Sequence, residues 1–583
     1  MAYYMGVFGG QGPNPAAALV NDGAIVAFAE EERFSRIKGA PSAIPVGAMS
    51  HCLQQAKVGL EDVAQIGFAW DCDRYVREIP SLLAEIEKRF GVTENAYNRI
   101  HEHRLRLNLD PARIKGDFRF SLAKRGFVLD ESRLVFHRHH LCHAASAFFC
   151  SGFERASILT LDGSGEEFTC VLCEGTGTSI RELTNFKLPD SLGGYYATFT
   201  EYLGFKPDEE EGKVMGLAPY GRLRADLQEK LDRVLHFDPD TGEFSVDPRY
   251  RFYGQRSHGQ RFSDQLVALF GPPRLRHEEV DDRHRDVAFN VQWRLEQVAI
   301  ALARRLIAAT GIRNLCLSGG VAMNCKMNGL IASLPEVERI FVQPASSDSG
   351  TALGAAYLCA LAGGVTRFER FEHAYWGSSF SDVQIESALK EAKIAYRRSP
   401  DVVLEASRHL EQGRIVGWFQ GAAEVGARAL GNRSILASPL VADMRAKLNR
   451  EVKHREKWRP FCPSVTEESY GKYFSGWPDS DFMILAFPVN EAYRALIPAA
   501  VHVDGTARPQ RVTRRANPRF HALLRRFGEA TGHEILINTS FNIQGEPVVD
   551  SPRDAVRCFG GTGIDVLAIG DFIAVKPAVD SPA

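Results

Sequence analysis

Two histidines one helical turn apart stand shortly before an apolar segment that ends in an aspartate. His139 and His143 are spaced i and i+4, which places both imidazoles on one face of a helix. Such a pair can hold one borderline metal ion, and Asp162 follows the apolar run at 156–161, where a carboxylate can reach the same ion. A zinc-hydrolase helix of the H-E-x-x-H type is excluded, because no glutamate follows the first histidine. The alternative is that one or both histidines only cap or pack the helix.

Glycine-rich segments flank several apolar stretches, and their backbone N–H groups can face phosphate oxygens. The glycines concerned are Gly163 and Gly165 around Ser164, Gly212 and Gly216 around Lys213, Gly319 with Gly320, and Gly350. Each such turn is a weak signal alone, but four of them, two beside an aspartate, fit a nucleotide-and-metal site between two lobes. Asp348 becomes the fourth ligand if its loop meets that of Asp162, and a His/His/Asp/Asp set suits iron, zinc or manganese. The chain lacks the P-loop pattern, so a nucleotide must be held in another way.

The last third of the chain is rich in arginine and carries a different chemistry. The residues concerned are Arg428 and Arg433 in the segment 426–434, then Lys453, Arg455 and Arg459 with Glu456 among them, then Arg508, and finally Ser540 in the segment 538–542. Guanidinium groups bind planar carboxylates and phosphates through paired hydrogen bonds, and Asn, Thr and Ser add neutral donors. The cluster therefore predicts a site for a small, multiply charged anion. Taken alone, the basic stretch 447–459 is more typical of a solvated helix face.

The remaining pattern predicts a mainly α/β protein, because strands alternate with helices. Strands are expected at 3–8, 16–20, 24–29, 156–161, 168–173, 314–318, 339–343, 414–419 and 534–537, and a long helix at 286–309. Asn21-Asp22-Gly23 between two apolar runs predicts a β-hairpin. Periodicity lapses around Tyr375, which predicts one domain at 1–375 and a second at 376–583. The segments 74–126 and 222–278 carry no interpretable motif.

Composition excludes several classes of function. Apolar residues make up 45% and charged residues 24% of the 583 positions, as in ordinary soluble proteins. A formal net charge of −2 gives no general attraction to nucleic acid or anionic membranes. We see neither a signal peptide nor an apolar run of the ~18 residues that a membrane span needs. Eleven irregularly spaced cysteines are typical of reduced thiols, so we expect a cytoplasmic protein.

The motifs together resemble the O-carbamoyltransferase family of nodulation proteins and antibiotic-tailoring enzymes, which includes tobramycin carbamoyltransferase. The resemblance extends along nearly the whole chain. The matching segments are Glu30–Ser35, His139–His143, Leu161–Gly165, Glu211–Pro219, Ser318–Asn324, Asp348–Gly350, Gly426–Ser434, Lys453–Glu456, Arg459–Phe461, Asp504–Arg508, Asn538–Asn542 and Gly545–Pro547.

The resemblance implies an enzyme with two sites. The N-terminal part is similar to the actin-like ATPase fold of the transferase that makes threonylcarbamoyl-adenosine in tRNA. The C-terminal α+β part is similar to the carbamoyl-adenylate-forming partner in that pathway. By this resemblance, the second site converts carbamoyl phosphate and ATP to carbamoyl adenylate, and the first transfers the carbamoyl group to a hydroxyl, or an amine, of a small natural product. A homodimer is the default expectation for the assembly.

The resemblance also implies roles for individual residues. His139, His143, Asp162 and Asp348 would hold a metal, with Fe²⁺ the family expectation and other divalent ions as alternatives. ATP, accompanied by Mg²⁺, would contact Gly163, Ser164, Gly165, Lys213, Gly216, Gly319, Gly320, Asn324 and Gly350. Arg428, Lys453, Arg459, Arg508 and Ser540 would hold the carbamoyl and phosphate groups.

One position departs from the family pattern, and two other functions remain alternatives. Many members carry a histidine in the position of a general base where this chain has Pro13, which cannot transfer a proton. We expect the transfer to persist with a different base. The alternatives are a tRNA threonylcarbamoyl transferase, which predicts salt-sensitive tRNA binding, and a non-catalytic ATP-binding regulator, which leaves the arginine cluster without a task.

Overall fold

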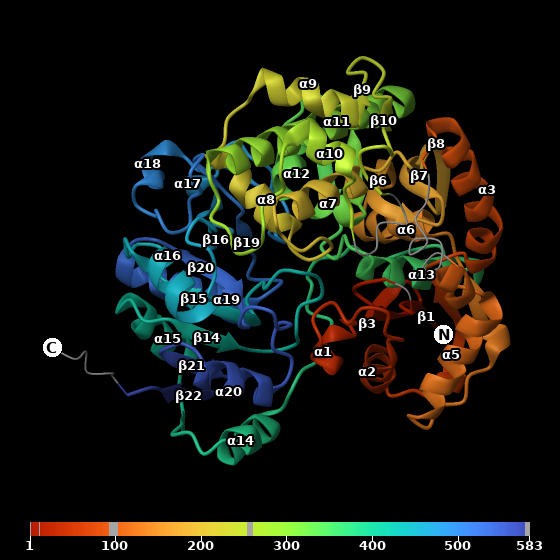
Figure 1. Cartoon of the computed structure of the whole chain (residues 1–583). Coiled ribbons are helices and arrows are strands. Elements are labelled where there is room, and N and C mark those ends of the chain that lie inside the picture. The colour runs from red at the N-terminus through yellow and green to blue at the C-terminus, as the bar shows by residue number, and fades with distance from the viewer. Residues whose placement is uncertain (1, 11, 93–102, 253–259, 578–583) are drawn as a thin grey trace. The chain divides into compact units, whose positions relative to one another are not determined.

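The chain divides into two compact units in the computed structural model, which describes residues 2–10, 12–92, 103–252 and 260–577 (Figure 1). Unit 1 comprises Met1–Ser35 and Gly39–Phe371, and unit 2 comprises Arg36–Lys38 and Glu372–Ala583. Across the described residues, no helix is both long and apolar enough to cross a membrane. All eleven cysteines are buried free thiols.

The first sheet of unit 1 begins with the N-terminal hairpin. Its five strands, in the order β3-β2-β1-β4-β5, are β3 (Ala24–Glu30), β2 (Ala16–Asn21), β1 (Tyr3–Phe8), β4 (Val63–Phe68) and β5 (Leu134–Phe136). β1, β2 and β3 are antiparallel, whereas β4 and β5 run parallel to β1. The predicted turn joins β2 to β3, and Asp22 and Gly23 both have the positive φ that such tight turns require.

The second sheet of unit 1 repeats this topology. Its order is β12-β11-β6-β7-β8, formed by β12 (Arg339–Val342), β11 (Asn314–Ser318), β6 (Arg155–Gly165), β7 (Phe168–Thr176) and β8 (Ser179–Lys187). β6, β7 and β8 are antiparallel, and β11 and β12 run parallel to β6. Two sheets, each with three antiparallel strands extended by two parallel ones, form the duplicated architecture of the actin-like ATPases. The predicted fold of this part is confirmed.

Helices cover these sheets, and two of them connect the sheets to each other. The helices of unit 1 are α1 (Glu32–Ser35), α2 (Val46–Ala56), α3 (Cys72–Phe90), α5 (Pro111–Ala123), α6 (His139–Ser151), α7 (Leu192–Tyr202), α8 (Glu211–Leu217), α9 (Ala225–Val234), α10 (Asp264–Phe270), α11 (Asp282–Thr310), α12 (Cys325–Ala332) and α13 (Ser349–Ala362). α13 packs on β1, β2 and β4 of the first sheet, and α6 packs on β6 and β11 of the second. Because α13 also packs against α6, the ends of both sheets are fixed relative to each other.

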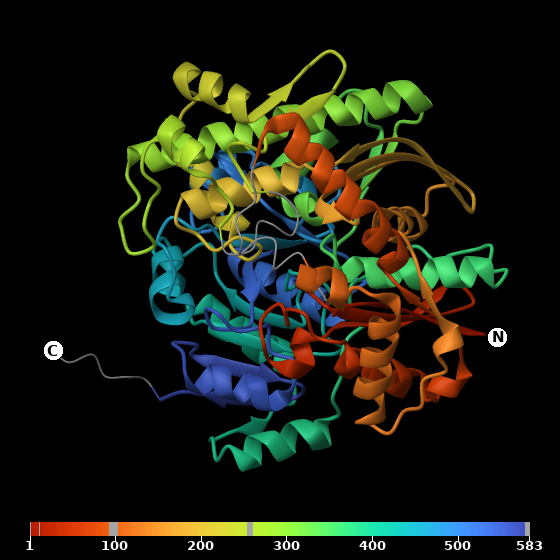
Figure 2. The same cartoon turned by 45° about the vertical axis from the view of Figure 1, so that its right-hand side comes forward.

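The outer part of unit 1 is built around α11, the predicted long helix. Figures 1 and 2 both show α11 beside α9 and the small hairpin of β9 (Leu235–Phe237) and β10 (Phe244–Val246). The buried side chain of Arg294, on α11, binds the carbonyl of Gln228 on α9 and the carbonyl of Leu235. The hairpin and α9 thereby extend the core around α11.

One segment of unit 1 differs from the sequence prediction. Gly212-Lys-Val-Met-Gly216 was expected to form a glycine-rich turn, but it lies within the helix α8. α8 packs against α11, and Met215 Sδ lies 3.7 Å from Cys325 Sγ at the start of α12. These tertiary contacts outweigh the low helix propensity of the two glycines.

Unit 2 contains one eight-stranded mixed sheet with helices on both faces. Its order is β13-β22-β21-β14-β15-β20-β16-β19, formed by β13 (Arg397–Arg398), β22 (Phe572–Val575), β21 (Val566–Ile569), β14 (Val416–Phe419), β15 (Arg433–Ala437), β20 (Ile535–Ser540), β16 (Cys462–Thr466) and β19 (Gln510–Val512). Only the pairs β14–β21 and β16–β19 are parallel. The short strands β17 (Phe487–Pro488) and β18 (Thr506–Ala507) form a separate antiparallel pair.

Two apolar cores lie on the two faces of this sheet. The helices of unit 2 are α14 (Asp382–Glu391), α15 (Val402–Glu411), α16 (Met444–Lys447), α17 (Tyr470–Tyr473), α18 (Glu491–Arg494), α19 (Pro518–Thr531) and α20 (Pro552–Gly560). Trp418 packs with residues of α15 and α19 in one core, and Phe419 packs with residues of α14 and α20 in the other. Adjacent residues of β14 therefore point to opposite faces, as a pleated strand requires. In Figure 1, α14 and α20 lie on the side of β21 and β22.

The basic stretch 447–459 is not a simple solvated helix face. After α16 the chain forms a π-helical turn at Leu448–Lys453, and His454 leaves it with a positive φ. Lys453 is 6% exposed, so this side chain of the stretch lies inside unit 2 and not on a solvated face. The rest of the stretch continues as a loop to β16.

Candidate metal and anion sites

The four predicted metal ligands of unit 1 converge on one point. One nitrogen or oxygen from each of His139, His143, Asp162 and Asp348 lies within 4.8 Å of all the others. The Nε2 atoms of the two histidines are 3.0 Å apart. Asp162 Oδ2 lies 3.1 Å from His139 Nε2 and 3.4 Å from His143 Nε2, and Asp348 Oδ1 lies 3.6 and 3.9 Å from the same two nitrogens.

The fold explains how residues so far apart in the sequence meet. His139 is the first residue of α6, and His143 follows one turn later. Asp162 lies in β6 where regular pairing with β7 is interrupted after Leu161, and Asp348 immediately precedes α13. Since α6 packs on both β6 and α13, its first turn faces the two aspartates.

Outer hydrogen bonds fix the direction of both imidazoles. His139 Nδ1 lies 3.1 Å from the carbonyl oxygen of Ala69, which can only accept, so Nδ1 donates its hydrogen there and Nε2 faces the cluster. His143 Nδ1 lies 3.0 Å from Ser318 Oγ, and Ser318 is the last residue of β11. Metal-binding histidines ordinarily have such partners on their second nitrogen. Trp70 adds an apolar wall, with its ring centre 5.0 Å from that of His139.

The electrostatics of the cluster call for a positive charge at its centre. Burial lowers the pKa of His143, and the charge on His139 lowers it further. Burial also opposes the charged form of His139, but the carboxylates of Asp162 and Asp348 outweigh it and raise the pKa of His139 well above its usual value. Burial and the charge of Asp162 raise the pKa of Asp348, whereas the two imidazoles hold the pKa of Asp162 well below its usual value against burial. A proton on His139 balances only part of the negative charge of the two carboxylates, whereas a bound divalent cation would balance both.

The residues fit a divalent metal ion. Two ligands about 2.1 Å from an ion and about 90–110° apart lie roughly 3.0–3.4 Å from each other. Three of the five ligand separations given above are in that range, and the other two, both to Asp348, exceed it by half an ångström or less. Two neutral imidazoles and two carboxylates carry a net charge that a divalent ion balances. Iron, zinc and manganese all suit this set.

Glu166 supports the same helix end from outside the cluster. Its carboxylate accepts hydrogen bonds from the backbone N–H groups of His139 and Asp71, at 3.1 and 2.7 Å. The charge of a carboxylate at a helix N-terminus also complements the helix dipole. Glu166 thus fixes the start of α6, and nothing in the sequence pattern distinguished it from Glu167.

The predicted nucleotide-binding residues fall into two groups within unit 1. Gly320 donates its N–H to Asp162 Oδ1 at 3.0 Å, which joins the turn at Gly319 to the segment Gly163–Gly165. Gly319 has a φ of 96°, and a Cβ there would lie 2.1 Å from the Leu161 carbonyl oxygen, so only glycine fits. Gly350 lies in the first turn of α13, two residues after Asp348. These glycines and Ser164 therefore lie beside the predicted metal ligands.

The second group already has structural partners. Lys213 Nζ pairs with Glu210 Oε1 at 2.7 Å, and Gly216 lies in the same helix α8. Asn324 caps α12 by accepting the Met327 N–H, and it exchanges two hydrogen bonds with the side chain of Gln292. A nucleotide that binds here must therefore use groups that also hold the fold.

The loop containing Pro13 lies beside the metal ligands. A Cβ on Gly12 would be 3.4 Å from Asp348 Oδ2, so the backbone next to Pro13 passes close to that carboxylate. The loop is held by hydrogen bonds from Asn14 N to the Gly39 carbonyl and from Ser42 N to the Gly12 carbonyl. A side chain with a titratable group at position 13 would be near the cluster, and proline provides none.

In unit 2, Lys453 holds the end of β20. Its Nζ lies 2.7 Å from the carbonyl oxygen and 3.2 Å from the Oγ of Ser540, and 3.0 and 2.7 Å from the carbonyl and side-chain oxygens of Asn542. Burial lowers the pKa of Lys453 well below its usual value, and the charges of Arg455 and Arg459 lower it further. Lys453 and Ser540, two of the predicted anion-binding residues, are thus in direct contact.

Three arginines gather around the same region. Burial and the neighbouring Arg459 lower the pKa of Arg455 to about 9, and Arg508 contributes to this shift. Arg455 stacks over Phe461 at 4.4 Å and donates to Asn449 Oδ1 and the Pro460 carbonyl. Buried cations that lie close enough to lower one another's pKa are typical of a site that binds an anion.

Arg428 lies in a loop whose shape depends on Glu424. Glu424 Oε1 accepts three backbone hydrogen bonds, from Leu430 at 2.8 Å, Asn432 at 2.7 Å and Arg433 at 3.1 Å. The loop leads into β15, which pairs with the end of β20. Arg433 itself is fully buried and donates to backbone carbonyls, so it has a structural task. Arg428 is half-buried.

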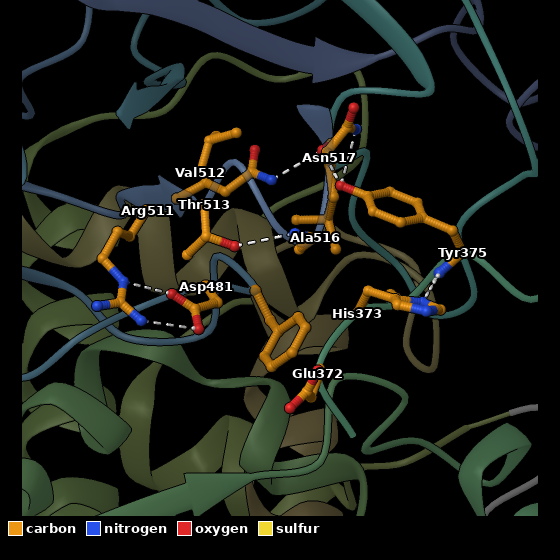
Figure 3. A pocket seen from close by; sticks show the side chains of 13 residues that line it. Glu372, His373, Tyr375, Asp481, Arg511, Val512, Thr513, Ala516 and Asn517 are labelled. Carbon is orange, nitrogen blue, oxygen red and sulfur yellow. Dashed lines mark hydrogen bonds and ion pairs between the residues drawn. The ribbon is translucent and has the colours of Figure 1, made fainter. Parts of the chain in front are cut away.

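A separate polar pocket in unit 2 includes none of the predicted site residues (Figure 3). Its walls contain the ion pair of Arg511 with Asp481 and the hydrogen bond from Asn517 to the Tyr375 hydroxyl, both drawn in Figure 3. Because these side chains bind one another, the pocket leaves few free groups for a ligand.

Comparison with known proteins identifies the family of the chain. The profile described as "Carbamoyltransferase N-terminus" matches residues 13–357, and that described as "Carbamoyltransferase C-terminus" matches residues 407–576. The chain belongs to the carbamoyltransferase family and is a transferase enzyme.

Relatives in several bacteria agree with this assignment. An uncharacterized protein of Synechocystis is 36% identical over 97% of this chain and 95% of its own length. Nodulation protein NolNO of Sinorhizobium fredii is 38% identical over 97% of this chain and 79% of its own. The 3'-hydroxymethylcephem-O-carbamoyltransferase of Amycolatopsis lactamdurans is 37% identical over 44% of this chain and 48% of its own. Among solved structures, component A of the Acidaminococcus fermentans (R)-2-hydroxyglutaryl-CoA dehydratase aligns with a TM-score of 0.31 and 13% identity, over 61% of this chain and 97% of its own.

Proposed function

We propose that this carbamoyltransferase works in two stages, one in each unit. In unit 2, carbamoyl phosphate and ATP are converted to carbamoyl adenylate, with one water taken up and phosphate and pyrophosphate released. In unit 1, a hydroxyl of a small acceptor attacks the carbamoyl carbon, and AMP leaves. The proposal assigns carbamoyl transfer to residues 1–375 and adenylate formation to residues 376–583.

The cation cluster of unit 2 is the observation that carries the first stage. Burial, together with the neighbouring charges of Arg459 and Arg508, lowers the pKa of Arg455 to about 9, and the charges of Arg455 and Arg459 lower that of the buried Lys453, so these cations repel one another. A compact polyanion relieves this repulsion, and phosphate oxygens match guanidinium groups in geometry as well as charge. The same cations would stabilise the charge that builds up on the α-phosphate as pyrophosphate departs. Arg428 and Ser540 are proposed to orient the carbamoyl end.

The metal ligands of unit 1 support the second stage. His139, His143, Asp162 and Asp348 would hold a divalent ion, for which we propose Fe²⁺. A bound ion of this kind polarises a phosphate or carbonyl oxygen and so activates the acyl group of the adenylate. Ser318 and Ala69 keep the imidazoles directed inward, and the glycines beside the ligands leave room for phosphate oxygens. ATP with Mg²⁺ is the proposed nucleotide.

The test is pyrophosphate release from ATP by the purified, iron-loaded protein with and without carbamoyl phosphate. Release that depends on carbamoyl phosphate, that is lost in Arg459→Ala and that persists in His143→Ala would support two separate sites. Transfer to a panel of hydroxylated small molecules should require His143 as well. If folded protein releases no pyrophosphate in response to carbamoyl phosphate, the first stage is wrong. If it forms the adenylate but carbamoylates no acceptor in a broad panel, the second stage fails.

A further inference from the structure

Gln510, the first residue of β19, is a buried amide that lies outside every predicted site segment of unit 2. Its side chain is 2% exposed. Its Nε2 donates to the carbonyl oxygen of Leu430 at 2.8 Å, and its Oε1 accepts from Ser464 Oγ at 2.6 Å and from Asn538 Nδ2 at 3.1 Å. Because a carbonyl oxygen can only accept, Nε2 must face Leu430, so the amide binds its three partners in a single orientation.

These hydrogen bonds join chain segments that carry residues of the proposed anion site. Leu430 follows Arg428 by two residues in the loop before β15. Asn538 precedes Ser540 by two residues on β20, and residues two apart on a strand share one face. Through one buried amide, Gln510 therefore fixes the loop of Arg428 relative to the strand of Ser540.

Gln510 also fixes the segment that contains Arg508. β19 runs parallel to β16, with Gln510 paired to Ser464. Arg508, two residues before Gln510, donates from Nε to Cys462 Sγ at 3.2 Å, and Cys462 is the first residue of β16. The hydrogen bond from Ser464 to Gln510 thus holds β19 to β16 beside the guanidinium of Arg508.

We propose that Gln510 is a positioning residue of the unit 2 anion site and sets the separation between Arg428, Ser540 and Arg508. The proposal rests on the proposed function of unit 2 and adds a residue that acts only through others. A small anion that bridges these side chains needs them at fixed distances, because charge-assisted hydrogen bonds depend on geometry and a displacement of about 1 Å is costly.

Gln510→Glu gives a readout that a merely structural role would not produce. An ionised carboxylate cannot donate to the Leu430 carbonyl, whereas a protonated one can, and both forms still accept from Ser464 and Asn538. Burial raises the pKa of the introduced carboxyl, so lowering the pH restores the missing donor. Tyr375 donates to the same carbonyl at 2.8 Å throughout, because burial raises the pKa of its hydroxyl above the usual value.

Other charged or titratable groups lie on the surrounding segments, namely Glu424, Lys453, Cys462, Asp481, Arg508 and Arg511. All of them are present in every variant. The ratio of variant to wild-type affinity at each pH therefore removes their contribution and that of the ligand's own titration.

Calorimetric titration with carbamoyl phosphate gives the Kd of full-length wild type, Gln510→Glu, Gln510→Met and Gln420→Glu at two pH values, about 5.5 and 8.5. The lost hydrogen bond predicts a Kd about tenfold weaker in Gln510→Glu at the higher pH and close to wild type at the lower one. Gln510→Met cannot donate at either pH, so its Kd should be about tenfold weaker at both.

Gln420→Glu is the matched control, because Gln420 is a 3% exposed amide of unit 2 whose side chain donates to the carbonyls of Ala568 and Gly570. It should keep wild-type affinity at both pH values. The inference is overturned if Gln510→Glu binds like wild type at both pH values, if its loss is the same at both, or if Gln420→Glu shares the loss. A wild type that binds no carbamoyl phosphate would overturn it as well. Carbamoyl-phosphate-dependent pyrophosphate release by the same wild-type sample reports separately on the proposed function.

Discussion

Replacing Ser318 by alanine tests whether the four ligands of unit 1 form a working metal centre. Ser318 is fully buried, and its Oγ is the partner of His143 Nδ1 at 3.0 Å. Alanine removes this partner but none of the four ligands, so the change affects only how well His143 is oriented and how basic it is. The ligand set stays complete.

The expected loss follows from the geometry around His143. Removing such an outer partner typically costs 10–100-fold in metal affinity, or about 1.4–2.8 kcal/mol. The ring of His143 is fully buried and packs edge-on against His139, with ring centres 4.6 Å apart. Because this packing still restrains the ring, we expect a loss near tenfold rather than a hundredfold.

The assay is anaerobic competition for Fe²⁺ between the protein and a coloured chelator, repeated with Zn²⁺ and Mn²⁺. Ser157→Ala is the control, because Ser157 is equally buried and donates to the Ile312 carbonyl at 2.8 Å, away from the ligands. His143→Ala should lose far more affinity than either. Equal metal affinity in the Ser318 and Ser157 variants would refute the orienting role, and a wild-type protein that binds less than one ion per chain would refute the metal centre itself.

Three further outcomes are expected, each read from thermal unfolding. Glu424→Gln should lower the stability of unit 2 by about 1–3 kcal/mol, because a 4% exposed carboxylate that accepts three backbone hydrogen bonds becomes neutral; an unchanged Tm would contradict this. Gly319→Ala should destabilise unit 1 by about 2 kcal/mol or more and weaken metal binding, because its Cβ would lie 2.1 Å from the Leu161 carbonyl oxygen; wild-type behaviour would show that the turn yields easily. Burial raises the pKa of Asp190 to about 6 from its usual 3.8. The folded state then holds a proton that the unfolded chain releases, so stability falls as the pH rises through this range. Asp190→Asn should therefore gain about 1–2 kcal/mol over wild type at pH 7.5 and less at pH 4.5, and a gain that is the same at both pH values would contradict the assignment.

Local sequence signals predicted several strands of the fold because their causes are local. The Asn-Asp-Gly turn and the alternation around it predict the hairpin of β2 and β3, and β11 has the predicted bounds. For the segment Gly212–Gly216 the prediction from local signals was wrong. Its two glycines favour a turn, but packing of Met215 on Cys325 and of α8 on α11 makes it helical, and packing between distant elements leaves no local signal.

The same difference between local signals and packing of distant elements decides how much of each candidate site could be predicted. The spacing of His139 and His143 follows from helix geometry, so their shared direction could be read directly from the sequence. Whether Asp348 joins them depends on α13 packing against α6. From the residues alone, Asp348 was a ligand only if its loop met that of Asp162, and the resemblance implied the full set. The partners that orient or hold the sites, such as Ser318 and Glu166, were assigned no role. A serine or glutamate becomes a support only through what the fold places next to it.

Lys453 shows that a residue predicted to bind a ligand can also have a task that the sequence does not reveal. Its place among arginines predicted a cation that binds an anion directly. In the structure it is buried, and its ammonium group donates hydrogen bonds to Ser540 and Asn542, so it already stabilises the loop that begins there. A site in which one cation is committed to the framework needs other cations to meet the ligand. We therefore expect Lys453→Met to disturb the loop as well as anion binding.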